Sequence, residues 1–294
     1  MATKLYGRLT DVRGMPAAGQ PGPVRVNIPI QGRLLNIKGR VTQAGVPATL
    51  ATMLTAIGEV RFILGTEVVR KWRFSEIVSV MLANGYTVDD GLFPIFFAEP
   101  WRATVLDEEL LSLQMAGFYD TVALEFDLVQ PTVPLAFNFP YEYTLIAKTY
   151  PKDHPQAGQL ARGILGHRIQ VENVGGGEPL IVLNPFEGAL QRIWAVIPST
   201  VDITRARLVQ GLTTFYDRYN TPGAPEIADS LKDMGMSIPP NFTDATGTFK
   251  MVPIIPDNNQ RISNSISDTT GLSLQLNLSG PAALRILMEH QIQR

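Results

Sequence analysis

The sequence predicts an all-β fold with short helical insertions, built from two similar units. Short apolar runs alternate with polar residues at the spacing that marks half-buried strands. Turn-forming residues separate these runs at regular intervals, which is the pattern of a β-sandwich. Helical patterns are too few to place a helix between most pairs of strands, as a parallel α/β sheet requires. The 294 residues accommodate two units of roughly 120 residues each.

An internal repeat indicates that the chain contains two similar units, because self-similarity at a fixed spacing is the sequence signature of a repeated architecture. The stretches Gly65–Gly85 and Gly211–Gly235 follow the same order: an apolar run ending in Gly, an aromatic and basic segment, then Glu-Ile and a short amphipathic helix. In both, the Glu stands nine residues before the closing Gly. Apolar runs at Phe93–Pro100 and Phe249–Pro256 continue the match. The alternative is two unrelated strand–helix segments of ordinary composition.

In the first half, residues 1–23 are rich in Gly and Pro and are predicted to form a flexible arm. Residues 24–129 are predicted to form the first unit. One helix is expected over Ser75–Asn84, with Ser75 as N-cap and Gly85 after its end. A second is expected over Thr104–Met115, with acidic residues in its first turn. Alternation predicts strands near residues 24–30, 35–41, 60–64, 93–97 and 122–128.

The segment 130–140 holds three prolines and no charge, so it is predicted to be a stiff linker. Residues 141–294 then form the second unit. Its helix is expected over Pro225–Met234, because Pro suits a first helical turn and Gly235 can end the helix. Its clearest strand is Leu272–Leu278, where Leu alternates strictly with polar residues.

Composition excludes several classes of function. Charged residues are 18% of the chain, below the ~25% of an average soluble protein, which favours extensive burial against other protein surfaces. A net charge of −2 with mixed signs argues against a direct nucleic-acid partner. The absence of Cys excludes disulfides and thiolate metal sites. The first residues lack the apolar core of a signal peptide, and the run Val41–Gly58 fits a sheet connection better than a transmembrane span.

No catalytic, cofactor-binding or metal-binding site is predicted. His154, His167 and His290 are scattered, whereas a double cupin enzyme would need paired histidines two residues apart. Gly175–Gly177 lacks the Lys-Ser/Thr ending of a phosphate loop and is interpreted as a turn.

Two further motifs have a structural and a functional interpretation. Asp89–Asp90 and Asp107–Glu109 fit a turn and a helix start, with an acid–base pair or calcium ligands as the alternative. The segment Arg70–Arg73 could stack nucleic-acid bases, but its apolar flanks favour packing at a domain or subunit face.

The run from Val24 to Leu128 resembles the N-terminal domain of the major capsid protein of corticoviruses, tailless bacteriophages with an internal membrane. The matching features are VRVNIPI, EVRFILGTEVVRKWRFSEIV, FPIFFAEP and VALEFDL. The C-terminal half resembles the second domain of that family at RIWAVIPSTVDI, at EIADSLKDMG and at the last strand. Residues 141–167 and the N-terminal arm have no matching features.

The resemblance implies a double jelly roll, with two eight-stranded β-sandwiches in tandem. It also implies a structural, non-enzymatic role as a homotrimeric, pseudo-hexagonal capsomer that tiles an icosahedral shell over a lipid membrane. Implied partners are other copies of the chain and the minor capsid, vertex and membrane proteins of the virion, which would assemble in the cytoplasm of a bacterial host. A receptor- or carbohydrate-binding spike-like sandwich and a sandwich-fold enzyme are the alternatives from other classes.

Overall fold

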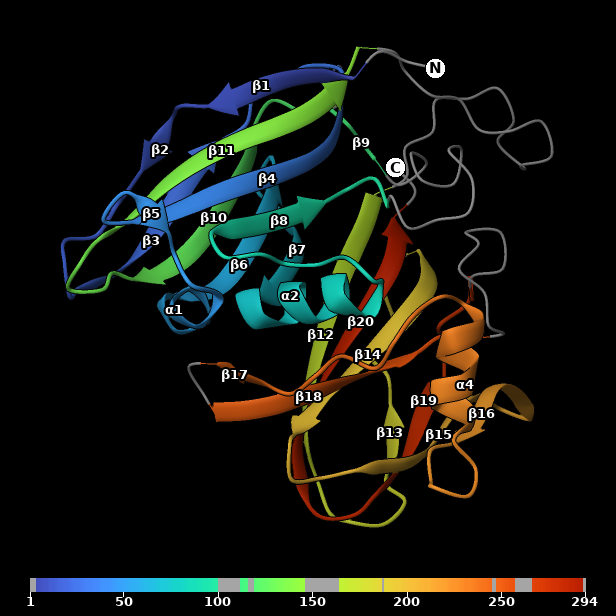
Figure 1. Cartoon of the computed structure of the whole chain (residues 1–294). Coiled ribbons are helices and arrows are strands. Elements are labelled where there is room, and N and C mark those ends of the chain that lie inside the picture. Colours follow the sequence, from blue (N-terminus) through green and yellow to red (C-terminus); the bar gives the residue numbers. More distant parts are fainter. Residues whose placement is uncertain are drawn as a thin grey trace. The chain divides into compact units, whose positions relative to one another are not determined.

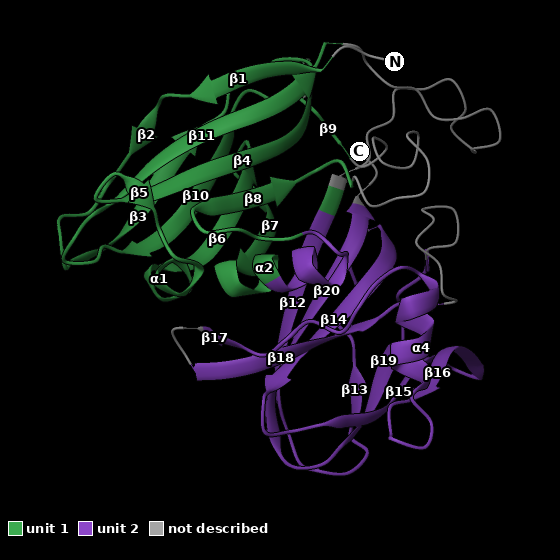
Figure 2. Ribbon diagram, in the orientation of Figure 1, with its two compact units in different colours: residues 1–78, 87–165, 293–294 green, residues 79–86, 166–292 purple. Residues whose placement is uncertain are grey.

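The computed structural model describes residues 4–99, 112–115, 119–145, 164–186, 188–244, 247–256 and 266–292. These residues form four antiparallel sheets and three α-helices (Figure 1). The chain divides into two compact units (Figure 2). Unit 1 contains residues 1–78 and 87–165, and unit 2 contains residues 79–86 and 166–292.

Unit 1 is a sandwich of two sheets. In the first sheet β1 (Leu5–Leu9), β11 (Leu135–Thr144) and β4 (Arg33–Gln43) lie side by side, and β8 (Leu92–Phe96) pairs with the far edge of β4. The second sheet has the order β3 (Pro21–Asn27), β10 (Val122–Val129), β6 (Ile57–Leu64) and β7 (Glu67–Arg73). The short strands β2 (Val12–Arg13), β5 (Val46–Pro47) and β9 (Leu113–Gln114) extend these sheets. The helices are α1 (Leu50–Ala56) and α2 (Phe74–Ala83), and residues 79–83 of α2 are counted with unit 2.

Unit 2 repeats this arrangement. One sheet has the order β12 (Ile164–Val174), β20 (Ala282–Ile292), β14 (Ala189–Pro198) and β18 (Gly247–Ile254), with β17 (Phe242–Asp244) at its edge. The other has the order β13 (Leu180–Val182), β19 (Leu272–Leu278), β15 (Ile203–Gln210) and β16 (Thr213–Tyr219). Helix α4 (Glu226–Asp233) follows β16.

The two units share one topology once the short strands β2, β5, β9 and β17 are set aside. Numbering the eight main strands of either unit in chain order, one sheet reads first, eighth, third, sixth, and the other reads second, seventh, fourth, fifth. This is the strand order of a jelly roll. Helix α2 and helix α4 both stand between the fifth and sixth strands. The predicted all-β fold of two similar eight-stranded sandwiches is confirmed, and the two predicted helices lie at equivalent places in the strand order.

An aromatic cluster fills the core of unit 1. Phe93 stands at its centre, with its ring centroid 5.0 Å from that of Phe74 and 5.4 Å from that of Phe126, both edge-to-face. Phe139 lies 5.9 Å from Phe93. All four rings are fully buried. Gly39 makes room for this packing, because a Cβ there would stand 3.0 Å from both Phe139 and Phe93.

The structure corrects the prediction for the N-terminal arm. Residues 5–9 and 12–13 are strands, and β3 begins at Pro21. Strand β1 is the first strand of the jelly roll and pairs along its whole length with β11. Gly7 is required there, since a Cβ would lie 2.4 Å from the ring of Tyr141. The Gly and Pro content of this segment therefore reflects turns and close packing, as at Gly14 and Gly19, where φ is positive.

The predicted linker at 130–140 is also wrong. Gln130 is buried, and its side-chain amide both donates to the carbonyl of Leu135 and accepts from its N–H, at 3.2 and 3.1 Å. Residues 131–134 therefore form a closed turn between adjacent elements. From Leu135 onward the chain is β11, the eighth strand of unit 1, so unit 1 extends past residue 140.

The two predicted helices of the repeat agree with α2 and α4 to within one residue at each end. The predicted helix Thr104–Met115 lies mostly outside the described residues, and its end forms strand β9 instead of a helix. In the run Val41–Gly58, Leu50–Ala56 forms helix α1, whose N-cap Thr49 accepts from the N–H of Thr52.

Candidate functional surfaces

The repeat is reproduced in the hairpins that precede the helices. Gly65 begins the two-residue turn between β6 and β7, and Gly211 begins the turn between β15 and β16. Their φ angles are 61° and 56°. A Gly with positive φ at the first turn position is the signature of a type II′ hairpin. Four residues later both hairpins carry a bulge, at Val69 and at Phe215, where the register of each strand pair shifts.

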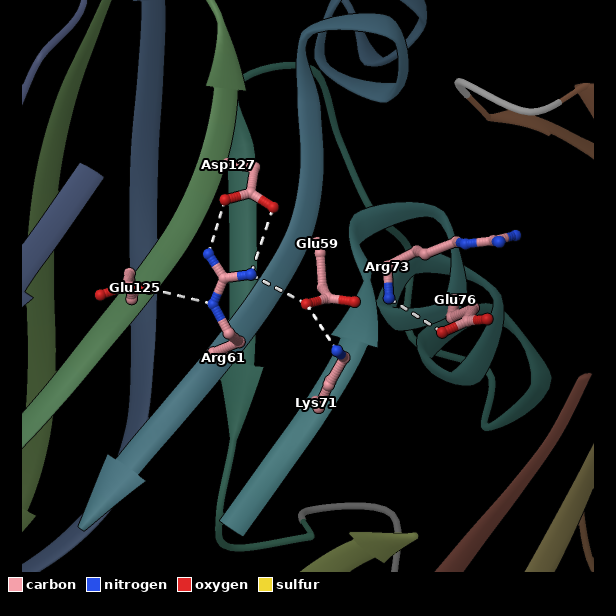
Figure 3. A network of polar contacts seen from close by, with 7 residues as sticks. All are labelled: Glu59, Arg61, Lys71, Arg73, Glu76, Glu125 and Asp127. Atoms are coloured by element: carbon pink, nitrogen blue, oxygen red, sulfur yellow. Dashed lines mark hydrogen bonds and ion pairs between the residues drawn. The ribbon is translucent and has the colours of Figure 1, made fainter. Parts of the chain in front are cut away.

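A charged network covers one face of the second sheet of unit 1 (Figure 3). Arg61 on β6 bonds bidentately to Asp127 on β10, at 2.5 and 3.2 Å. The same guanidinium contacts Glu125 at 3.0 Å and Glu59 at 2.8 Å, and Lys71 on β7 adds a second cation at 3.0 Å from Glu59. These contacts raise the pKa of Arg61 against the opposing effect of its partial burial. The network links three neighbouring strands through charge-assisted bonds.

The corresponding sheet of unit 2 carries its own charged group. Asp217 on β16 accepts two bonds from Arg205 on β15, at 2.9 and 2.8 Å, and lies 3.3 Å from the Nε of Arg207. The Arg205 guanidinium also lies 4.7 Å from the ring centroid of Tyr219. Hydrogen bonding from Arg205 is the largest cause that lowers the pKa of Asp217. Opposite charges thus pair across neighbouring strands in both units.

Sequence reasoning did not identify these charged groups. The signal for them was present as alternating charges on consecutive strands: Glu59 and Arg61 on one, Glu125 and Asp127 on another. Finding the pairs required the register, which places Glu125 directly opposite Arg61.

The two histidines that the structure describes are buried in unit 2. His167 lies on β12 with its Nε2 3.8 Å from Glu289, which is also bound by Arg192 from the neighbouring β14. His290 lies on β20, with its ring 4.8 Å from that of Phe186. Both histidines lie on paired strands of one sheet, β12 and β20. His154 lies outside the described residues.

The remaining candidate motifs have structural roles where the structure describes them. Asp90 accepts a hydrogen bond from the N–H of Leu50 at the start of α1, at 2.8 Å. Gly175–Gly177 turns the chain from β12 to β13, and Gly177 pairs with Leu278. Asp107–Glu109 lies outside the described residues.

The basic and aromatic segment Arg70–Arg73 is largely interior. The Arg70 guanidinium donates to the carbonyl of Phe96 at 2.7 Å and stacks 4.9 Å from the ring of Phe97. Both Arg70 and Trp72 are 5% exposed, so neither the Arg70 guanidinium nor the Trp72 ring is accessible to a nucleic-acid base. Arg70 and Trp72 therefore pack in the interior, while packing of this segment at a domain or subunit face stays a prediction.

The described part of the chain also lacks two kinds of feature. No three His, Asp or Glu side chains there stand close enough to hold a metal ion together. No helix there combines the length and the apolar character needed to cross a membrane.

No model of a known protein family matches this sequence, and no curated protein matches it. Solved structures do match over nearly its whole length. The major capsid protein P2 of bacteriophage PM2 superposes with a TM-score of 0.75 at 13% identity, over 98% of this chain and 97% of that one.

Chains of two other viruses also match. A chain of Sulfolobus turreted icosahedral virus matches with a TM-score of 0.59 at 10% identity, over 98% of this chain and 90% of that one. A chain of the PBCV-1 virus capsid matches with a TM-score of 0.57 at 10% identity, covering 99% and 94%. At sequence identities of 10–13%, these superpositions show a shared fold. The two successive jelly rolls of this chain are the double jelly-roll fold found in these viral capsid structures.

Proposed function

We propose that this chain is a structural major capsid protein without catalytic activity. The observation that supports it best is the likeness to the PM2 capsid protein, which covers nearly all of both chains and therefore includes both jelly rolls. In the described residues, the charged groups at Arg61 and Asp217 pair with oppositely charged side chains on neighbouring strands, which is a structural role.

The proposed building block is a homotrimer. Three chains of two like sandwiches place six similar units around a threefold axis, and that pseudo-hexagonal outline can tile the flat facets of an icosahedral shell. Cyclic symmetry closes each block. Neighbouring copies, together with minor capsid and vertex proteins, are the partners that this role requires.

Native mass spectrometry tests the building block. The trimer should weigh three times 32.3 kDa, about 97 kDa. It should resist dilution, because an obligate interface leaves little folded monomer. A stable monomer at micromolar concentration would contradict the proposal and favour the receptor- or carbohydrate-binding alternative.

The finer part of the proposal is a tailless bacteriophage whose shell encloses a lipid membrane and assembles in the bacterial cytoplasm. The sequence resemblance to the corticovirus capsid protein supports it. Electron microscopy of a source lysate, with lipid analysis of purified particles, tests this part separately. Icosahedral particles without lipid would retain the capsid role and exclude the internal membrane.

A further inference from the structure

The second main strand of each unit, β3 or β13, lies at the end of its sheet and is followed there by no other main strand. Val26 on β3 and Ile181 on β13 hold equivalent positions. From each, the strand register leads through two pairs to the residue that stands three before the hairpin glycine. The outer edge of this strand can therefore be compared residue by residue between the units.

In unit 1 a segment of the same chain covers this edge. The N–H of Ile28 bonds to the neighbouring β10, so the alternation of an antiparallel pair turns the backbone groups of Arg25 and Asn27 away from β10. Strand β2 lies on that side, with Arg13 opposite Arg25. The N–H of Asn27 donates to the carbonyl of Asp11 at 3.2 Å. The edge of β3 is therefore closed.

In unit 2 the equivalent edge is closed only in part. The N–H of Leu183 and the carbonyl of Pro179 bond to β19, so the backbone groups of the alternate residues Leu180 and Val182 point away from β19. The side-chain amide of Gln170 covers the edge at Val182 by donating to its carbonyl at 2.9 Å. No described residue bonds to the N–H or the carbonyl of Leu180 on that side.

The side chains beside this open edge are apolar. Leu180 and Val182 are each 61% exposed. They stand where unit 1 has the polar residues Arg25 and Asn27. Depletion of charge marks the core of a protein interface, and an open strand edge is a template for another strand. The edge of β13 combines both features.

We propose that β13 of one copy pairs antiparallel with β13 of a second copy, with the two Leu180 residues opposite each other. The two backbones then exchange their N–H and carbonyl groups reciprocally. Because Gln170 occupies the edge at Val182, the free stretch is short, and a second β13 is short in the same way. The contact is isologous, so the same patch serves on both copies, and the apolar side chains there bring no like charges together.

This pairing joins trimers and does not build them. A ring of three uses head-to-tail junctions, whereas a reciprocal contact has twofold symmetry. An icosahedral shell has twofold contacts between its blocks, and in a shell of this chain a second copy is the partner present in equal number to the edge. The inference therefore rests on the proposed function and names one contact between neighbouring blocks.

Single cysteines test the pairing, because the chain has no Cys of its own. On mild oxidation, Leu180→Cys should give a disulfide-linked dimer of about 65 kDa, twice 32.3 kDa. Val46→Cys is the matched control, since Val46 is 62% exposed in unit 1. Leu180→Cys should crosslink at least about tenfold faster, because paired strands hold the two thiols at a high effective concentration. Non-reducing gels follow both reactions, and equal rates would overturn the pairing.

Leu180→Lys gives a second test, because it places two ammonium groups against each other at the contact. The trimer of about 97 kDa should remain, but its further association should be lost. Leu212→Lys makes the same change at a fully exposed hairpin residue and should associate like wild type. Sedimentation velocity measures each state, and circular dichroism checks that the variants are folded.

Unchanged association of Leu180→Lys would contradict the pairing and leave the capsid proposal standing. A wild-type chain that forms only dimers, lost in Leu180→Lys, would support the pairing and contradict the proposed trimer. The two failures are therefore distinguishable.

Discussion

The Glu226 carboxylate accepts a hydrogen bond at 3.0 Å from the backbone N–H of Tyr219, the last residue of strand β16. In unit 1 Glu76 does the same for Arg73, the last residue of β7, at 2.8 Å (Figure 3). Both strands are sheet edges, where unpaired N–H groups invite pairing with another chain. The Glu-Ile pair of the repeat therefore has a physical role: it ties the start of each helix to the end of the preceding strand.

Removing the two carboxylates should affect the units unequally. Glu76→Ala should lower the free energy of unfolding by about 1–3 kcal/mol, because Glu76 is buried and the N–H of Arg73 would lose its partner away from water. Glu226→Ala should cost less than about 1 kcal/mol, since Glu226 is exposed and water can replace its carboxylate. Urea unfolding of both variants measures the difference.

Glu76→Gln is the matched control, because its amide oxygen can still accept the hydrogen bond. It should recover part of the stability lost in Glu76→Ala. Equal losses for Glu76→Ala and Glu226→Ala would show that burial does not govern the strength of this contact.

The hairpin glycines should be equally sensitive in the two units. Gly65→Ala and Gly211→Ala should each cost about 1–2 kcal/mol, because both positions have positive φ, which an L-residue adopts only under strain. Nothing lies within 4 Å of a Cβ at either position, so steric contact would not contribute. Gly175→Ala, where a Cβ also meets nothing and φ is not positive, is the control and should be nearly neutral. Thermal unfolding curves compare all three.

The sequence revealed those parts of the fold that depend on local chemistry. Gly65 and Gly211 set turn geometry, and Glu76 and Glu226 begin helices, so their spacing was visible without contacts. Strand β1 was missed because its pattern is interrupted by Gly7, whose role is to admit the ring of Tyr141 from a distant strand. Strand β11 was missed because Pro134 and Pro140 predict a break. Pro140 is nevertheless accommodated within the sheet opposite Arg8.

The shared face of strands β1 and β4 was beyond sequence reasoning for a similar reason. Arg8 and Arg40 are far apart in the chain and lie in segments that read as an arm and a strand. They share a face only because β11 lies between β1 and β4 and fixes the register of both. A sequence pattern can indicate that a residue is exposed, but only the strand pairing shows which residues lie beside it on the neighbouring strands.

Acid should weaken unit 2 through Asp217. Hydrogen bonding from Arg205 holds the pKa of Asp217 below its usual 3.8 in the folded state. The resulting stabilisation is fully present above pH 3.8 and is lost as the pH falls through the lowered folded-state pKa. Asp217→Asn should therefore be less stable than wild type near neutral pH, and the difference should shrink once the pH drops below 3.8. Urea midpoints across this range measure it, and a pH-independent difference would refute the linkage.

The Arg61 network of unit 1 can be tested by removing its guanidinium. Arg61→Met keeps most of the side-chain length but leaves Glu59, Glu125 and Asp127 near one another. The remaining cations are Lys71, 3.0 Å from Glu59, and Arg25, 3.8 Å from Glu125. The loss should be about 1–2 kcal/mol near neutral pH, where the three carboxylates repel.

Arg61→Lys serves as the control: it retains the charge but cannot form the bidentate pair with Asp127, so its loss of stability should be smaller than that of Arg61→Met. Urea unfolding of the three proteins near neutral pH measures both losses. If Arg61→Met is as stable as wild type, the guanidinium is not what balances these carboxylates.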